Sequence, residues 1–596
     1  MEQRIREAEI VSFDIFDTLV KRNIKCPEDV HELVRKKYFE QTGIDICEYR
    51  KLRVNAEKKA RRYSGIEEIS LEDILNALRE VPDGEKGKLQ EIEEETEIAV
   101  CCPDLRMKAI YEYALKEGKR VIITSDMYLD ERIVKKILQK CGYDNFERLY
   151  LSSTYGVCKA TGNLYEVIKK DYPSFQGKIL HIGDNVKSDY AVPKSKGLEA
   201  LLIDGQRNLL RYWSKDNKNV KDQLLYGSLF SFLNNHIEEE SNDVVHIAYE
   251  VLGPMLLGYC VWLNERVKRE GIEKIFFLSR EGKVLQEAFN ILYPYSKIKQ
   301  TYLFVSRQAL VVPLLADAND FDEMIKILKV FLHVPNLKTI CVLCGLEQDK
   351  FNEELTHIDL DQETKIYEIS GKKKAEVYCI IQKMGGYRFK QQKRYVLEYL
   401  KENDFNGNIA IVDIGWAGTM QIALQEYVKE TDTVLRGYYF GVRNMEKSDY
   451  YNCIFRNGYL FEAGKNRDNN FDLMLRFTTE IFELLLLNKT GSVCKYSLEK
   501  NQIAPVLGEP EYIGDEGMFL ESIQSKALHF LNSIRREMEF WGNLEVSAEI
   551  PMAPYSNFAV FPKMDTIKMF ESFKFFTDGN VRKLLPEHTL CYYIFH

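Results

Sequence analysis

The stretch that decides the fold is Ile10-Val11-Ser12-Phe13-Asp14-Ile15-Phe16-Asp17-Thr18-Leu19. Its first residues are mostly apolar, which predicts a buried strand, and Asp14 follows directly at the carboxyl end of that strand. Functional groups of open parallel sheets lie at such strand ends. Taken alone, Asp14 and Asp17 would be interpreted as turn or helix-capping residues. The interpretation therefore depends on the segments that follow along the chain.

Three later segments share this form, since each places polar or charged residues at or after an apolar stretch: Val121-Ile122-Ile123-Thr124-Ser125-Asp126, Val157-Cys158-Lys159-Ala160-Thr161-Gly162 and Ile179-Leu180-His181-Ile182-Gly183-Asp184. Each alone has a plain structural interpretation. Ser125 and Asp126 could cap a helix predicted near residues 131–139, and Lys159 could be a solvated lysine. Four such segments in this order favour one active site over four unrelated turns.

The residue types fit phosphoryl transfer. A carboxylate at a strand tip can attack phosphorus and split one difficult step into two, so Asp14 is the candidate nucleophile. The hydroxyl of Ser125 and the charge of Lys159 would stabilise the phosphoryl oxygens. Mg²⁺ prefers one or two carboxylates together with phosphate and water, which suits Asp14 and Asp184, with Asp189 as a direct or indirect ligand. The sequence thus predicts a Mg²⁺-dependent phosphohydrolase site.

The four segments together resemble the four signature motifs of the haloacid dehalogenase (HAD) superfamily of hydrolases. This resemblance implies a Rossmann-like parallel α/β sheet, an aspartyl-phosphate intermediate on Asp14 and Mg²⁺ as cofactor. In the superfamily, the backbone carbonyl two residues after the nucleophile also binds the metal, and here that carbonyl belongs to Phe16.

One position departs from the phosphatase pattern of the superfamily. Most of its phosphatases carry a second aspartate two residues after the nucleophile, which protonates the leaving oxygen and later activates water. Here Phe16 occupies that place and Asp17 follows it. Either Asp17 supplies the proton, or the substrate has a good leaving group, or the domain binds phosphate without turnover. Dehalogenases of the superfamily also carry an aromatic residue there, so a dehalogenase is a minor alternative.

The composition of the 596-residue chain is that of a cytoplasmic enzyme. Its net charge of −9 argues against a nucleic-acid partner. The charged residues 1–4 lead straight into the first strand, so we expect no signal peptide. The most apolar stretch, residues 251–263, is too short to span a bilayer and contains Pro254. The 13 cysteines are expected to be reduced, and Cys341 and Cys344 to be buried core thiols.

The pattern predicts three parts. Residues 1–210 form the HAD-like domain, with a helical cap at about 25–100 that includes a capping-box-like helix start at Ser70. Residues 211–244 form a linker. Residues 245–596 form a second α/β domain of unknown function.

Two strand–turn–helix elements stand out in that second domain. The strand predicted at 274–278 leads into Ser279-Arg280-Glu281-Gly282, and the strand predicted at 409–412 leads into Asp413-Ile414-Gly415-Trp416-Ala417-Gly418-Thr419. A glycine turn at a helix N-terminus offers N–H groups to an anion, although an ordinary tight turn looks the same in sequence. These turns predict a possible second anion site for a nucleotide or sugar phosphate, formed by Arg280, Arg307, Asp413, Gly415, Gly418 and Thr419.

The whole chain resembles a group of long bacterial HAD-type proteins. The shared segments are residues 13–19, 125–129, 279–282 and 413–419. Such proteins often occur beside glycosyltransferases in surface-polysaccharide gene clusters, which implies a sugar-phosphate or nucleotide-sugar substrate and a glycosyltransferase partner. An alternative stays open: a glycan-assembly transferase whose chemistry lies beyond residue 245, with the HAD domain as a regulatory, phosphate-binding module.

Overall fold

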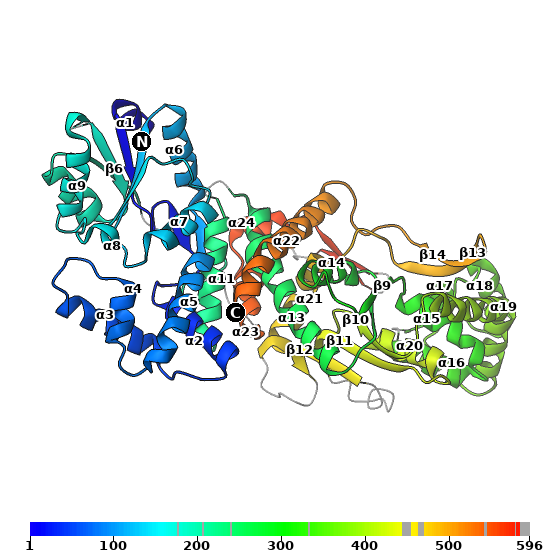
Figure 1. The fold of residues 1–596 in the computed structure, drawn as a ribbon. Coiled ribbons are helices and arrows are strands. Elements are labelled where there is room, and N and C mark those ends of the chain that lie inside the picture. Colours follow the sequence, from blue (N-terminus) through cyan, green and yellow to red (C-terminus); the bar gives the residue numbers. More distant parts are fainter. Residues whose placement is uncertain are drawn as a thin grey trace. The chain divides into compact units, whose positions relative to one another are not determined.

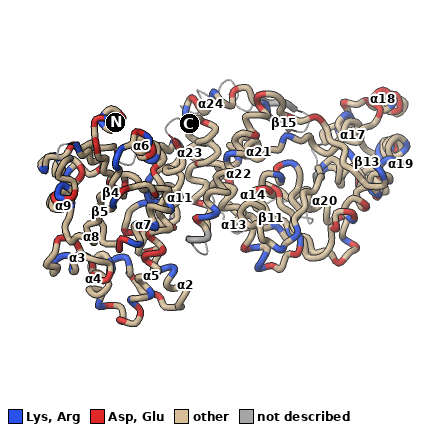
Figure 2. The backbone as a smooth tube through the Cα atoms, turned by 45° about the horizontal axis from the view of Figure 1, so that its top comes forward, with Lys and Arg blue, Asp and Glu red and all other residues tan. Residues whose placement is uncertain are grey.

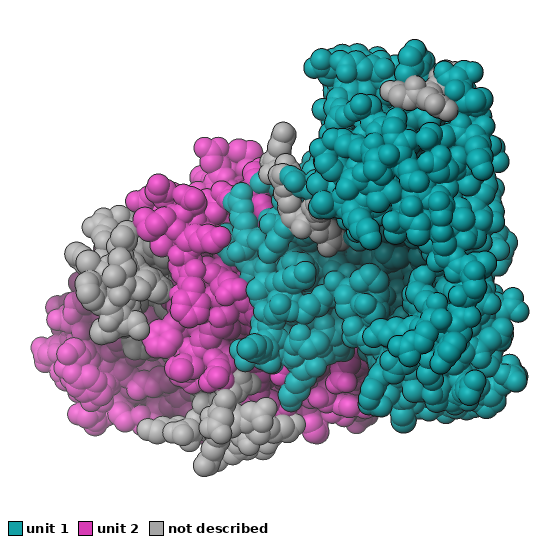
Figure 3. Space-filling model, turned by 90° about the vertical axis from the view of Figure 1, so that its left-hand side faces the viewer, with its two compact units in different colours: residues 1–241, 534–544 teal, residues 242–533, 545–596 magenta. Residues whose placement is uncertain are grey.

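The computed structural model describes residues 1–175, 178–204, 208–238, 241–331, 334–443, 455–462, 470–541, 545–577 and 580–583. The chain divides into two compact units (Figure 3): unit 1 is residues 1–241 with 534–544, and unit 2 is residues 242–533 with 545–596. The stretch 211–244, predicted as a linker, contains helix α11 (Gln223–His236) and the short α12 (Asp243–His246). The predicted boundaries at 210 and 245 remain a prediction.

Unit 1 is built on a five-stranded parallel sheet (Figure 1) with the order β5-β4-β1-β6-β7. Its strands are β1 (Ile10–Phe13), β4 (Arg120–Ser125), β5 (Arg148–Leu151), β6 (Ile179–Gly183) and β7 (Glu199–Leu202). The central strand β1 pairs Phe13 with Ile123 on one side and with Ile182 on the other. Counted within this sheet, the order is 3-2-1-4-5, so the direction of winding reverses between β1 and β6. Ligands of open α/β sheets bind outside the carboxyl ends of strands at such a reversal.

The two faces of this sheet are covered by separate sets of side chains. Val11 and Phe13 belong to one apolar cluster and Ile10 to another, as the period of two in a strand requires. The helices of the unit 1 core are α1 (Glu2–Glu7), α6 (Leu105–Lys116), α7 (Glu131–Lys140), α8 (Ser152–Tyr155), α9 (Asn163–Asp171), η1 (Pro173–Phe175), the π-helical η2 (Val186–Ala191) and α10 (Val192–Ser195). The Rossmann-like parallel sheet predicted from sequence is confirmed.

A helical cap is inserted between β2 (Val20–Arg22) and β3 (Cys101–Pro103), which pair antiparallel. It consists of α2 (Asp29–Thr42), α3 (Tyr49–Tyr63), α4 (Leu71–Ala77) and α5 (Asp83–Val100). The predicted capping box is present, since Ser70 accepts from the Asp73 N–H and Asp73 accepts from the Ser70 N–H. The inserted cap is therefore confirmed.

The cap encloses charged groups. Figure 2 shows the acidic run along α5, and two of its carboxylates, Glu93 and Glu97, are buried. Arg53, itself fully buried, donates two hydrogen bonds to Glu93, while Arg22 donates to Glu97 at 3.3 Å. The hydroxyl of Tyr128 lies within 3.5 Å of both carboxylates. A buried charge is costly without a partner, so Arg53 pairs with Glu93 inside the cap, while Arg22 and Tyr128 connect α5 to residues outside the cap helices.

Unit 2 is a second α/β unit on another five-stranded parallel sheet, with the order β12-β11-β10-β8-β9. Its strands are β8 (Lys274–Leu278), β9 (Lys299–Leu303), β10 (Asn408–Val412), β11 (Val434–Val442) and β12 (Phe455–Glu462). Counted within this sheet, the order is 2-1-3-4-5, so the winding reverses between β8 and β10. The second α/β domain predicted from sequence is confirmed. The winding of its sheet reverses at the two strand–turn–helix elements predicted from sequence, those that follow β8 and β10.

The remaining elements of unit 2 surround this sheet. The helices are η3 (Ile247–Leu252), α13 (Gly253–Arg269), α14 (Gly282–Leu292), α15 (Arg307–Val311), η4 (Val312–Asp317), α16 (Phe321–Phe331), α17 (Leu337–Leu343), α18 (Gln348–Thr356), η5 (Ile366–Glu368), α19 (Lys372–Glu402), α20 (Thr419–Val428), α21 (Asn470–Leu486), α22 (Gly514–Trp541), which runs into unit 1, α23 (Glu549–Ala559) and α24 (Met564–Met569). Two hairpins complete it: β13 (Val493–Glu499) with β14 (Gln502–Leu507), and β15 (Lys574–Thr577) with β16 (Asn580–Lys583). Cys341 and Cys344 lie buried in its core, as predicted.

One helical run, Asp243–Arg269, differs from its prediction. The sequence predicted the apolar stretch within it to be too short to cross a bilayer, but the run is 27 residues long and is apolar enough to do so. Pro254 lies at the start of α13, where the run passes from the π-helical η3 into α-helix. The most apolar window of the run is 89% buried inside the protein, as in the core helix of a globular unit.

Candidate active site

The candidate nucleophile Asp14 follows the central strand β1 and is almost fully buried. Its N–H donates to the Ile182 carbonyl at 2.9 Å, which continues the pairing of β1 with β6. Lys159 Nζ donates to Asp14 Oδ1 at 2.5 Å, and the Thr18 hydroxyl lies 3.5 Å from Oδ2. Burial raises the pKa of Asp14, and the charge of Lys159 opposes that effect. The structure thus brings the first and third segments together.

Asp189 holds Lys159 from the other side. Lys159 Nζ donates to Asp189 Oδ1 at 2.7 Å, and the Asn185 N–H donates to Asp189 Oδ2 at 3.0 Å. Burial acts to raise the pKa of Asp189, but the charge of Lys159 outweighs it and holds that pKa well below its usual range. Burial acts to lower the pKa of Lys159, yet Asp14 and Asp189 raise it well above its usual range. Lys159 is therefore a fixed positive charge between two carboxylates.

Two residues for which no role was predicted, His181 and Gly183, complete this arrangement. His181 Nε2 lies 3.3 Å from Asp189 Oδ1, and His181 Nδ1 lies 2.8 Å from the Ser12 hydroxyl. A Cβ on Gly183 would lie 2.6 Å from the Asp189 side chain, so glycine is required for this approach. The sequence feature that could have predicted a role for His181 is its place in an apolar strand. A buried histidine there needs polar partners on the same face.

Asp14, Asp184 and Asp189 can hold a metal ion. Each offers a carboxylate oxygen, and these oxygens lie within 4.8 Å of one another, the one such group of three among the described residues. Burial, with the charges of Asp14 and Asp17, raises the pKa of Asp184 to about 6. Hard oxygen donors with excess negative charge fit Mg²⁺. Both oxygens of Asp189 accept hydrogen bonds from N–H groups, whereas Asp14 accepts one such bond, from Lys159, and a longer contact of 3.5 Å from the Thr18 hydroxyl, so Asp14 is the less occupied of the two.

Phe16 and Asp17 lie in the turn that follows Asp14. The guanidinium of Arg22 lies 4.0 Å from the centre of the Phe16 ring. Asp17 adopts a left-handed conformation with φ of 57°, and its N–H donates to the Val20 carbonyl at 2.8 Å. Position 16 therefore carries no proton donor, whereas the charge of Asp17 acts on Asp184, whose pKa it helps to raise.

The second segment places Ser125 at the buried carboxyl end of β4, beside β1. Asp126 does not cap the following helix, whose N-cap is Asp130. It accepts instead from the N–H groups of Lys159 and Ala160, at 2.8 and 3.3 Å. The plain interpretation of Asp126 as a helix cap is thus wrong, because the chain that carries Lys159 lies closer to it than the helix does.

The residues of the predicted second anion site lie along the carboxyl edge of the unit 2 sheet. Arg280 follows β8 and forms an ion pair with Glu511, while Arg307 is the first residue of α15. Gly415 has φ of 136°, and a Cβ there would lie 2.6 Å from the Gly441 carbonyl oxygen. Close packing on β11 thus explains that glycine without an anion.

The other members of this set flank the turn after β10. Gly418 and Thr419 are the N-cap and first residue of α20. Asp413 is 7% exposed, and its Oδ1 accepts from the Ile414 N–H at 2.8 Å. Burial, together with Glu281 and Glu483, raises the pKa of Asp413 to about 8, although Arg307 acts against it. Glu483 accepts from the Trp416 indole N–H at 3.1 Å. The edge is polar and charged, but its charged groups include three carboxyl groups, those of Glu281, Asp413 and Glu483. When ionised, they would repel an anion.

Sequence comparisons find no protein-family model and no curated protein that match this chain. Its structure is similar to solved hydrolases of the HAD superfamily, the superfamily that the four motifs resemble. A Bacillus subtilis protein named as a HAD-hydrolase, YfnB, bound to magnesium, is 16% identical over 32% of this chain and 86% of its own, with a TM-score of 0.25. CbbY from Rhodobacter sphaeroides, in complex with phosphate, is 15% identical over 33% of this chain and 87% of its own, with a TM-score of 0.25. The L-2-haloacid dehalogenase from Xanthobacter autotrophicus is 14% identical over 32% and 75%, with a TM-score of 0.24.

Proposed function

We propose that unit 1 is a Mg²⁺-dependent phosphohydrolase that works through an aspartyl-phosphate on Asp14. One observation carries the proposal: Lys159 Nζ lies between Asp14 and Asp189, at 2.5 and 2.7 Å, in a cluster that also contains Asp184. This cluster lies at the carboxyl ends of β1 and β6, where the winding of the sheet reverses.

Each residue has a distinct role in this proposal. The Asp14 carboxylate attacks phosphorus as the bond to the leaving oxygen breaks, and water then cleaves the acyl phosphate to release inorganic phosphate. Lys159 and the hydroxyl of Ser125 stabilise the phosphoryl oxygens. Asp14, Asp184 and the Phe16 carbonyl would hold Mg²⁺, which supplies positive charge to the phosphoryl group.

The leaving group receives no proton from position 16. Phe16 packs under Arg22, so we propose that the substrate has an acidic leaving group or that Asp17 supplies the proton. A phosphorylated small molecule is the proposed substrate class. A sugar phosphate or nucleotide sugar, a glycosyltransferase partner and a cytoplasmic role in surface-glycan synthesis are proposals that rest on the resemblance to long bacterial HAD-type proteins.

A phosphatase screen tests this function. Purified protein is assayed on aryl, acyl, alkyl and sugar phosphates, with Mg²⁺ and with a chelator. We expect Mg²⁺-dependent release of phosphate, fastest from aryl and acyl phosphates, that Asp14→Asn abolishes. Asp184→Asn should weaken Mg²⁺ binding and abolish the activity, while Asp144→Asn, an exposed aspartate, should change neither. Activity that survives in Asp14→Asn would contradict the proposal, and halide release from haloacids would favour the dehalogenase alternative.

A second candidate function belongs to unit 2. The turns after β8 and β10, which meet at the reversal of its sheet, carry Arg280, Glu281 and Asp413. A carboxyl group held neutral near pH 7 is a candidate proton donor, which supports the alternative of a transferase with its chemistry in this half. We expect a nucleotide or sugar phosphate to raise the melting temperature of the full-length protein, and Thr419→Val to reduce that shift. Equal shifts of the melting temperature in Thr419→Val and wild type would show that Thr419 does not bind the ligand.

A further inference from the structure

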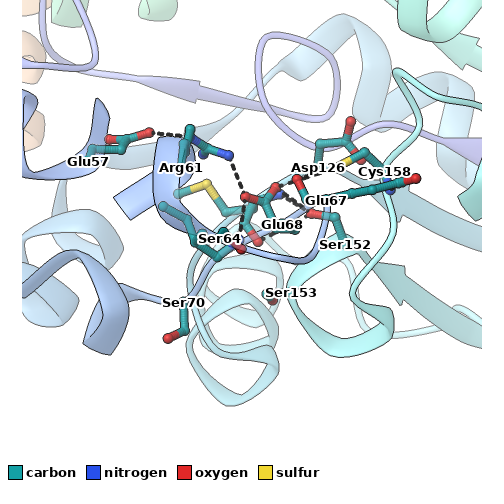
Figure 4. A network of polar contacts seen from close by, with 12 residues as sticks. Glu57, Arg61, Ser64, Glu67, Glu68, Ser70, Asp126, Ser152, Ser153 and Cys158 are labelled. Carbon is teal, nitrogen blue, oxygen red and sulfur yellow. Dashed lines mark hydrogen bonds and ion pairs between the residues drawn. The ribbon is translucent and has the colours of Figure 1, made fainter. Parts of the chain in front are cut away.

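A loop of the cap, residues 64–70, contacts the core loop that carries Lys159 and, at Ser152, the start of α8 (Figure 4). It connects α3 with α4 and places two adjacent carboxylates, Glu67 and Glu68, against the core. Figure 4 shows both side chains directed at core residues that include Ser152 and Cys158. Each carboxylate contacts a different segment of the core.

Glu67 binds the loop of Lys159. It accepts from the Cys158 N–H at 2.8 Å, from the Thr161 hydroxyl at 2.7 Å and from the Asn163 amide at 2.5 Å. The next two N–H groups, those of Lys159 and Ala160, donate to Asp126 of the core. Three successive N–H groups are thus bound by one carboxylate of the cap and one of the core. These contacts determine the path of the backbone that carries Lys159.

Glu68 reaches the loop that follows Ser125 through Ser152, the first residue of α8. It accepts from the Ser152 hydroxyl at 2.9 Å, and Ser152 Oγ in turn accepts from the Met127 N–H at 2.8 Å. Glu68 is 3% exposed, and Arg61 of the cap neutralises it at 2.6 Å. Because Arg61 belongs to the cap as well, this charge stays paired whether or not the cap lies against the core. The energy of the contact therefore rests on hydrogen bonds and not on an ion pair with the core.

We propose that Glu67 and Glu68 are positioning residues that form a latch, so that closing of the cap fixes the loops of Lys159 and Ser125 in their active arrangement. The importance of these loops for turnover rests on the proposed function, whereas the mechanical coupling does not. Glu67 is exposed to solvent, where water can replace each hydrogen bond that opening breaks. Such a latch orders the site and still opens readily, as a cap that must release product requires.

Amide hydrogen exchange of the full-length protein tests the latch without reference to turnover. In Glu67→Ala we expect the Cys158 amide to exchange about fivefold faster, as the loss of one bond of ~1 kcal/mol implies. We also expect faster exchange at Lys159 and Ala160, which Glu67 does not touch. Glu67→Gln, which keeps an acceptor, should lie between wild type and Glu67→Ala. Glu72→Ala, an exposed carboxylate at the start of α4, is the matched control.

The outcomes separate the two proposals. Faster exchange at Cys158 alone, with Lys159 and Ala160 unchanged, would show a local contact and overturn the latch. Faster exchange of all three amides supports it, even if no phosphate ester is hydrolysed by the wild type, which would overturn the proposed function instead. With an active substrate, Glu67→Ala should lower kcat several-fold while its melting temperature matches that of Glu72→Ala. A fall in melting temperature with unchanged kcat would assign Glu67 a purely structural role.

Discussion

Both parallel sheets place a buried aspartate directly after their central strand, but the two aspartates have opposite surroundings. Asp14 follows β1 and is 6% exposed, while Asp413 follows β10 and is 7% exposed. Burial and Asp189 raise the pKa of Asp14, but Lys159 Nζ lies 2.5 Å from its carboxylate and opposes them. At Asp413, burial and the neighbouring carboxylates both raise the pKa. Equal strand position therefore does not imply equal chemistry: a paired carboxylate suits a nucleophile, and a neutral carboxyl suits a proton donor.

The largest expected effect tests this difference through the pH dependence of stability. The folded pKa of Asp413, about 8, lies above its unfolded value near 4, so the folded state binds more protons in between. Stability should therefore fall as the pH rises from 4 to 8, by on the order of 4 kcal/mol from this one group. Asp413→Asn should remove that loss, and at pH 8 the variant should be more stable than wild type.

Denaturant unfolding at pH 5 and pH 8 measures this prediction for wild type, Asp413→Asn and the exposed control Asp432→Asn. If the stability of wild type and of Asp413→Asn changes with pH in the same way, Asp413 is ionised in the folded protein. The contrast between the two aspartates would then disappear.

The next effect concerns the proton donor that the unit 1 site lacks. Phe16→Asp restores the pair of aspartates usual in the superfamily that the motifs resemble, and well-placed acids contribute about 10²–10⁴-fold in rate. Because Arg22 lies 4.0 Å from the Phe16 ring, it would lower the pKa of the new carboxyl, so we expect the lower end, about 10²-fold, for alkyl phosphates. Aryl phosphates, whose leaving groups need little help, should gain far less.

The ratio of alkyl to aryl rates measures this effect in wild type, Phe16→Asp and Asp17→Asn. If Asp17→Asn alone removes alkyl activity, then Asp17 already serves as the acid and position 16 is not a deficit. A ratio unchanged by either substitution would show that proton donation does not limit the reaction.

A smaller effect compares two glycines, one at each reversal of winding. In Gly183→Ala the new Cβ would lie 2.6 Å from Asp189, which must move and release Lys159. In Gly415→Ala it would lie 2.6 Å from the Gly441 carbonyl oxygen in a backbone that disfavours side chains. Overpacking of this kind costs about 1–3 kcal/mol. We expect both variants to melt earlier, but only Gly183→Ala to lose phosphatase activity. Equal activities would mean that Asp189 does not position Lys159.

The sequence predicted the strands and their polar ends well, because both depend on local pattern. The apolar runs before Asp14, Ser125 and Asp184 became β1, β4 and β6, and the run predicted at 274–278 is β8. The order of strands could not be predicted, since it depends on pairing between distant segments. For the same reason no local pattern indicated that Glu67 of the cap contacts the loop of Lys159, more than ninety residues away.

Side-chain roles within the sites were harder to predict than their positions. Asp126 looks like a helix cap in sequence, and only the fold brings it to the N–H groups of Lys159 and Ala160. Gly415 looks like an anion-binding glycine, yet its conformation is explained by packing on Gly441. Both cases turn on contacts between segments far apart in the chain, which local pattern does not encode.

The smallest expected effect compares two carboxyl groups that hold the turns of the two sites. Asp126 accepts two N–H groups of the Lys159 loop, so Asp126→Asn leaves one N–H facing an amide NH₂ and should cost about 1 kcal/mol. Glu483 accepts one bond from Trp416, and burial together with Glu281 raises its pKa to about 7. At pH 6 it is largely neutral, so Glu483→Gln should change stability by less than about 0.5 kcal/mol.

Above pH 7 the two variants should diverge further. Wild type must then ionise Glu483 beside Glu281, while the glutamine variant avoids that charge, so Glu483→Gln should become the more stable protein as the pH rises to 8. Burial also raises the pKa of Asp126, but Asp126→Asn loses the acceptor for one of two N–H groups, so it should stay less stable than wild type at both pH values. Melting temperatures of wild type and both variants at pH 6 and 8 measure this. If Glu483→Gln is less stable than wild type at pH 8, then Glu483 is ionised and a neighbouring positive charge stabilises it. The surroundings of Glu483 would then resemble those of Asp14 beside Lys159, and the two sites would differ less than the contrast between Asp14 and Asp413 suggests.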